Sequence, residues 1–387
     1  MVLFEPHNDP LKILPLSLKL FASIGVSGNP ADRVRLYGSY FYLCFVQFVP
    51  KLCMGYETIP QCFRSIAEGM FSFNTCVTIV LLPLRFGQFE SLLQDLKRFT
   101  ELVSTNEEYK QILVTLNTAI HKFTKYYFIF TNIIVVAMTC SSFAGVLYTY
   151  FLRKSNQSAV YPLIMEHRIY VLDAKRNLAH CFIHQVLILL ALYILLVAFV
   201  AKAGAFCGSI RFCSTVLEIV ALKIDRLSLL VSGEQYVGEL REIILLHQLA
   251  IKCAKQLQGI LMEILLAQFT GCVLIWCFML YSVMISGITA EGITVMAMLT
   301  AFSTETFMFC LLGNELTLKG EQIGAAMYAS NWYEQPVQIQ KLIVPILQQS
   351  QQRIGISAAK FYYIDYNRYG LSLKTAYSFY LLLKDIF

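Results

Sequence analysis

The chain has 387 residues, of which 57% are hydrophobic and only 14% are charged, with a formal net charge of +6. A soluble domain carries about 25% charged residues, so this composition argues against a soluble protein and predicts a membrane protein with several spans. The basic residues are divided among many segments, and so they do not indicate nucleic-acid binding. The 12 cysteines show neither a CxxC pair nor metal-ligand spacing.

The hydrophobic runs predict an all-α protein with seven transmembrane helices. A spanning helix needs about 20 mostly apolar residues. Residues 1–37 precede the first such run and are expected to be a cytoplasmic segment. The expected spans are Gly38–Tyr56, Ile66–Leu84, Tyr126–Leu152, Cys181–Phe206, Leu261–Ser286, Ile293–Leu312 and Tyr369–Phe387. The last one is the weakest, because it contains Lys374, Lys384 and Asp385. Long amphipathic segments between spans predict helices that continue beyond the bilayer on one side.

The distribution of lysine and arginine predicts the orientation of the spans. Twenty of these residues lie in the segments on the N-terminal side of the membrane, and seven lie on the opposite side. Because basic residues are retained in the cytoplasm, the N-terminus is expected inside and the C-terminus outside. Asn156 begins an Asn-Gln-Ser glycosylation triplet in a segment that this topology places outside.

The third span carries small and polar residues on one face, at Ser142, Gly145 and Thr149. Such a face either leaves room for a small ligand or permits close packing of two helices. If it lines a ligand pocket, residues at similar depth on the second, fourth and sixth spans would complete it. The expected ligand-contacting set is Met70, Phe73, Asn74, Ser142, Gly145, Thr149, Ile183, His184, Leu187, Met296, Leu299, Thr300 and Ser303.

The last span has a polar stripe. Thr375, Ser378, Leu382 and Asp385 fall on one face of a 3.6-residue helix. Two readings are open: a pore wall with a hydrophobic constriction and a carboxylate at its mouth, or a polar face packed on its own protein.

His180 and His184 are spaced as two metal ligands on a helix can be, but no third ligand is evident, so no metal site is predicted. The run from Asn331 to Glu334 predicts a turn, with Pro336 opening a helix that continues through Leu347. No nucleophile, zinc-protease or phosphate-loop motif is present, so we expect neither an enzyme nor a bound cofactor.

The C-terminal third resembles insect odorant receptors. The resemblance rests on Gly313-Asn314-Glu315, on Trp332-Tyr333, and on the run Leu371–Tyr380 close to the C-terminus. It is specific over about residues 302–387, whereas the remainder agrees in length and span number. The Lys384 side chain beside Asp385 is a departure, since it offsets the negative charge near the expected pore mouth.

This resemblance implies a ligand-gated cation channel built as a heterotetramer with the family's co-receptor. It implies that the outer-half pocket binds a small volatile, that residues 38–313 form spans one to six, and that residues 361–387 line the pore. Leu382 and Ile386 would then form the gate. Residues 314–360 would form a cytoplasmic anchor, with subunit contacts at Trp332, Tyr333, Leu342 and Ile346.

The chain is too short for the long cytoplasmic insertion of the co-receptor, which favours an odour-specific subunit in the plasma membrane of a sensory-neuron dendrite. A gustatory receptor of the same superfamily is the nearest alternative, and a seven-span metabotropic receptor is a more distant one.

Overall fold

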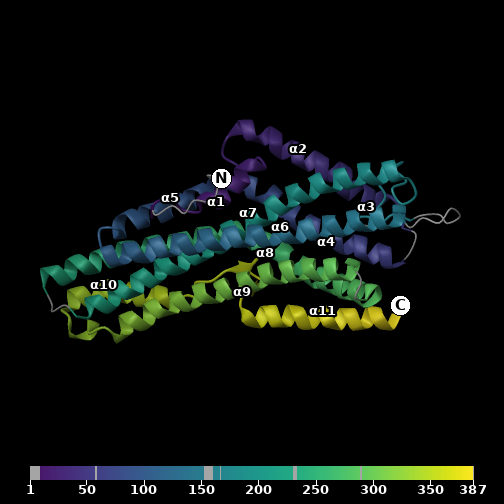
Figure 1. Cartoon of the computed structure of the whole chain (residues 1–387). Coiled ribbons are helices and arrows are strands. Elements are labelled where there is room, and N and C mark those ends of the chain that lie inside the picture. The colour runs from purple at the N-terminus through teal and green to yellow at the C-terminus, as the bar shows by residue number, and fades with distance from the viewer. Residues whose placement is uncertain are drawn as a thin grey trace.

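The computed structural model describes residues 9–56, 59–151, 160–165, 167–229, 233–287 and 290–386. Nearly all of these residues are helical, and the long helices lie side by side in one elongated bundle (Figure 1). One end of the bundle carries α10, and the other carries the C-terminus. We call the second one the C-terminal end. The predicted all-α architecture is confirmed.

The elements follow one another in this order. The N-terminal part contains α1 (Pro15–Ser23), a 3-10 turn at Pro30–Asp32, α2 (Arg33–Leu43), a π-helical turn at Cys44–Phe48 and α3 (Val49–Cys53). The bundle helices are α4 (Ile59–Leu84), α5 (Phe86–Val103), α6 (Glu107–Phe151), α7 (Leu178–Leu227), α8 (Glu234–Ser286) and α9 (Ala290–Ala329). The C-terminal part contains a 3-10 turn at Trp332–Glu334, α10 (Val337–Ser350), β1 (Ser357–Ala358), β2 (Tyr362–Tyr363) and α11 (Tyr366–Ile386).

Five helices in the described ranges are long and apolar enough to cross a membrane, namely α4, α6, α7, α8 and α9. The four from α6 to α9 have 45, 50, 53 and 40 residues, about twice the length that a bilayer requires. They therefore continue beyond the bilayer, as the amphipathic segments predict. The two remaining expected spans, Gly38–Tyr56 and Tyr369–Phe387, fall largely on the α2–α3 unit and on α11, and they stay predictions.

Helix α7 forms the centre of the bundle, and α1, α4, α6, α8 and α9 all pack on it. Its side chains are buried almost without interruption from Leu195 to Val220, as expected for a helix that is apolar on every face. Asn177 caps its first turn, because the side-chain oxygen accepts a hydrogen bond from the Ala179 amide at 2.9 Å.

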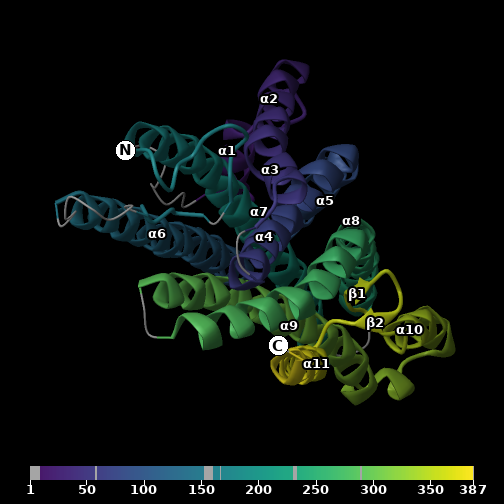
Figure 2. The same cartoon turned by 90° about the vertical axis from the view of Figure 1, so that its right-hand side faces the viewer.

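A short hairpin places α11 at the edge of the bundle. β1 and β2 pair antiparallel, and the amide of Ala359 donates to the carbonyl of Met262 on α8 at 3.1 Å. From there α11 packs along α8 and α9, and it lies beside α9 when the bundle is seen end-on (Figure 2). Strands of two residues leave no alternating pattern in a sequence, so this hairpin was not predicted.

Candidate functional site

An apolar cavity of about 60 Å³ lies among α4, α6, α7 and α9. Two helices provide most of its wall, each with side chains at i, i+3, i+4 and i+7. The lining residues are Phe71, Thr131, Ile134, Val135, Met138, Leu192, Leu195, Leu196, Phe199, Met298 and Ala301. This spacing places the four lining residues of α6 on one face of that helix, and the four lining residues of α7 on one face of theirs.

The cavity offers a ligand almost only apolar contact. Thr131 is its single polar side chain, and its hydroxyl donates to the carbonyl of Tyr127 on the same helix at 2.9 Å. Aromatic rings close one side, with the Phe71 and Phe199 rings 5.3 Å apart between centroids. A hydrogen bond from Tyr127 Oη to the carbonyl of Ala301, at 3.1 Å, joins α6 to α9 beside the cavity.

A charged network lies directly behind Phe199. The Lys202 ammonium forms an ion pair with Glu305 at 2.9 Å, although the two side chains are only 1% and 0% exposed. The same ammonium donates to Asn74 Oδ1 at 3.3 Å and to Gln268 Oε1 at 3.1 Å. These four residues come from α7, α9, α4 and α8, and all lie within expected spans. The network therefore ties together three of the four helices that wall the cavity.

The structure brings Ser142 and Gly145 together against the segment between α6 and α7. A Cβ atom on Gly145 would lie 2.6 Å from Pro162 Cγ, and the Ser142 hydroxyl donates to the Pro162 carbonyl at 3.3 Å. Thr149 donates to the Gly145 carbonyl within α6. This face of α6 is thus occupied by protein.

The hydrogen bond of His184 goes to the same segment between α6 and α7, and not to His180. Its Nε2–H donates to the backbone carbonyl of His167 at 3.1 Å, and the two imidazole centroids are 5.5 Å apart. His180 instead accepts from the Asp173 amide at 3.3 Å. Burial, with a contribution from the Lys51 ammonium, lowers the pKa of His167 to about 2, so this imidazole is neutral. His167 was not singled out from the sequence.

The thirteen predicted ligand contacts lie on α4, α6, α7 and α9, the helices that wall the cavity, but none of them lines it. Phe73, Ile183, Met296 and Thr300 are exposed on the bundle surface, while Met70 and Leu299 are half-buried against the core. Asn74 belongs to the charged network, Leu187 packs beside the α6–α7 segment, and Ser303 is half-buried. Their role as ligand contacts stays a prediction.

The residues that line the apolar cavity carry a weak sequence signal. Leu192, Leu195 and Phe199 recur at helical spacing, but every neighbouring position in that span is apolar too. In a membrane helix the periodicity cannot distinguish a residue that faces a cavity from one that faces lipid.

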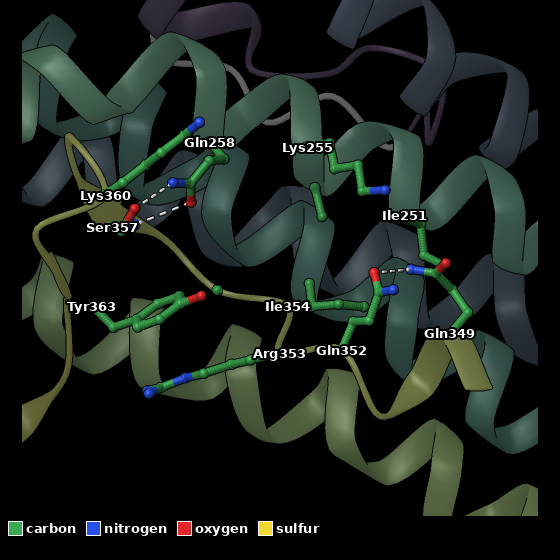
Figure 3. A pocket seen from close by; sticks show the side chains of 12 residues that line it. Ile251, Lys255, Gln258, Gln349, Gln352, Arg353, Ile354, Ser357, Lys360 and Tyr363 are labelled. Carbon is green, nitrogen blue, oxygen red and sulfur yellow. Dashed lines mark hydrogen bonds between the residues drawn. The ribbon is translucent and has the colours of Figure 1, made fainter. Parts of the chain in front are cut away.

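A second cavity, of about 350 Å³, lies between α8 and the chain that joins α10 to the hairpin (Figure 3). Three of its lining side chains are basic and none is acidic. Lys255 and Lys360 stand on opposite sides of it, and the Arg353 guanidinium lies 4.0 Å from the Tyr363 ring centroid. Glutamines provide much of the remaining wall. This basic lining does not suit an uncharged apolar ligand, whereas the lining of the smaller cavity does.

Helix α11 is largely uncovered. Only Ser372 and Ala376 are buried, whereas Leu382 is 57% exposed and Asp385 and Ile386 are exposed as well. Thr375 and Ser378 satisfy their hydroxyls by donating to carbonyls of their own helix. The polar stripe therefore faces away from the rest of the chain.

The residues expected at subunit contacts divide into two pairs. Tyr333 and Leu342 are exposed, whereas Trp332 and Ile346 pack into the core of their own chain. Pro336 immediately precedes α10, as predicted. Asn156, the glycosylation candidate, lies outside the described residues.

The family model described as 7tm Odorant receptor matches residues 58–377. The chain belongs to this family. It is 26% identical over 102 residues to the odorant receptor coreceptor of Anopheles gambiae, and 23% identical over 183 residues to odorant receptor 94a of Drosophila melanogaster. These matches cover 26% and 46% of this chain, and 21% and 47% of the two relatives. The matched regions thus span less than half the length of these relatives.

The fold is similar to that of the olfactory receptor OR5 from Machilis hrabei, solved in complex with eugenol. The TM-score is 0.77 at 16% sequence identity, and the alignment covers 97% of this chain and 98% of that receptor. The predicted membership and membrane fold are confirmed. The odorant receptor family contains receptors rather than enzymes, and the match favours it over the gustatory receptors.

Proposed function

We propose that this chain is the odour-specific subunit of an odorant-gated cation channel, assembled as a heterotetramer with the family's co-receptor in the plasma membrane of a sensory-neuron dendrite. The observation that carries the proposal is the apolar cavity walled by α4, α6, α7 and α9. An apolar site with few polar groups is what a small uncharged ligand requires.

The ligand is a small uncharged volatile. The aromatic side of the cavity favours an aromatic or heterocyclic molecule. Burying a ring-sized molecule contributes a few kcal/mol at roughly 25 cal/mol per Å². The cavity volume of about 60 Å³ is smaller than such a molecule, so side chains must move to admit it. Met138 and Met298 line the cavity, and methionine is the most adaptable apolar side chain.

The exposed α11 supports assembly into a channel. Its polar stripe would be poorly placed in lipid, and it would instead face a pore formed together with neighbouring subunits. Leu382 then contributes to a hydrophobic constriction, and Asp385 lies about one turn further towards the C-terminus to attract cations. An odorant opens this channel only if it binds the open state more tightly than the closed one.

The test compares two neighbouring residues of α6. Val135 lines the cavity, whereas Val136 is 58% exposed on the bundle surface. Each is replaced by phenylalanine, and currents are recorded with the co-receptor across a panel of volatiles. Val135→Phe should raise the half-maximal odorant concentration about tenfold or more, since one methylene in an apolar pocket already changes binding by about 1–3 kcal/mol. Val136→Phe should resemble the parent receptor. Equal responses of both variants would refute this cavity.

A further inference from the structure

The Lys202 ammonium is held at a fixed point by groups from three other helices. It pairs with Glu305 of α9 at 2.9 Å and donates to Gln268 of α8 at 3.1 Å and to Asn74 of α4 at 3.3 Å. Gln268 returns a hydrogen bond from Nε2 to Glu305 Oε2, also at 3.1 Å. Two hydrogen bonds and one ion pair thus surround the ammonium, which has three N–H donors.

A buried ion pair is not the most stabilising way to join helices in a membrane. Well-packed apolar side chains of similar volume often stabilise a protein as well as a buried ion pair does, or better. Ionisable residues inside spans are therefore rare and mark functional positions. The location of this pair indicates what that function is.

Lys202 touches the wall of the apolar cavity from behind. Its Nζ lies 5.3 Å from the centroid of the Phe199 ring, and the aromatic neighbours of that ring are Phe71 at 5.3 Å and Tyr127 at 5.8 Å between centroids. A cation over an aromatic face holds the ring through the ring's quadrupole. Glu305 follows Ala301, another lining residue, by one helical turn. Both ends of the ion pair are thus attached to the cavity wall.

We propose that Lys202 is a positioning residue for odorant recognition, which fixes the Phe199 ring and so determines which odorants fit the cavity. This inference rests on the proposed function. A purely structural role predicts that removing the pair lowers the amount of receptor at the surface but leaves its preference among odorants unchanged. A positioning role predicts a changed preference.

The experiment measures half-maximal concentrations for a series of volatiles of graded ring size, with the co-receptor and at matched surface expression. The main variant is Lys202→Met with Glu305→Gln, which removes both charges together. The control is Lys319→Met with Glu218→Gln, because that pair joins the same two helices, α9 and α7, at 2.9 Å, about five helical turns from the nearest lining residue on either helix. We expect the ratios among odorants to shift about three- to tenfold in the main variant and to stay at parental values in the control.

A second variant is tested in case the receptor that lacks both charges does not reach the cell surface. Glu305→Asp keeps both charges but draws the ammonium away from Phe199, and Glu218→Asp, which acts on the Lys319 pair, is its control. Only the first should change the odorant ratios. In a receptor that already carries Phe199→Leu, adding the Lys202 or Glu305 substitutions should no longer change those ratios.

Unchanged ratios in a variant that still responds to odorants would overturn the positioning role and leave the proposed function intact. Absence of any odorant-evoked current in the parent receptor would instead overturn the proposed function.

Discussion

Gly145 shows how a single residue sets the packing of α6. An added Cβ would lie 2.6 Å from Pro162 Cγ, and the proline ring cannot swing aside as a flexible side chain would. Gly145→Ala should therefore displace the α6–α7 segment and cost about 1–3 kcal/mol of stability. Gly145→Trp should do so more severely, by breaking this contact rather than by filling the ligand cavity.

Thermal unfolding of the detergent-purified assembly would measure this effect. Gly238 of α8 provides the control, because nothing lies within 4 Å of an added Cβ there. Gly238→Ala should leave stability unchanged or raise it by up to about 1 kcal/mol. A Gly145→Ala protein that unfolds at the parental temperature would contradict the close contact.

The same residues show where sequence reasoning stops. The shared face of Ser142 and Gly145 was predictable from helical spacing, but what fills that face was not. Pro162 comes from a segment without periodicity, so nothing in the sequence places it there. Lys202 and Glu305 were each visible as charges inside apolar spans. Their pairing depends on how α7 and α9 pack, which no local pattern encodes.

At the scale of elements, α11 makes the sharpest functional prediction. Leu382→Ser should raise the current without odorant severalfold, because a polar side chain wets a constriction that otherwise excludes water. The effect should be partial, since the other subunits keep their own gate residues. Asp385→Ala should alter divalent-ion permeation or block with little change in odorant sensitivity.

Both variants are compared at equal surface expression with Leu373→Ser, which lies on the opposite face of α11. Resting current and ion selectivity identical to the parent in the Leu382 and Asp385 variants would mean that this helix does not line the pore.

The long helices were the most predictable elements, and the short ones were the least. Continuous apolar runs identified α4 and α6 to α9, and amphipathic stretches predicted their extensions. The first expected span is instead divided by a π-helical turn at Cys44–Phe48, just before Pro50, which lacks an N–H for the helix ladder. One π-helical turn within an apolar run leaves the hydrophobic pattern unchanged, so that pattern could not predict it.

For the whole molecule, orientation is the central prediction. Twenty basic residues on the N-terminal side against seven on the other predict an N-terminus in the cytoplasm. An N-terminal epitope tag should be labelled only after cells are permeabilised, and a C-terminal tag should be labelled on intact cells. Strong labelling of the N-terminal tag on intact cells would reverse the topology and remove the support for α10 as a cytoplasmic anchor.

The ion pair between Lys202 and Glu305 also constrains how the receptor is made. α7 leaves the ribosome before α9, on the order of ten seconds earlier at ordinary rates of synthesis. During that interval the lysine has no carboxylate partner, and a lone ammonium is unstable in hydrocarbon. We therefore expect α7 to stay beside the other spans until α9 arrives. In a chain interrupted after α8, Lys202 would have only the neutral oxygens of Asn74 and Gln268 as partners.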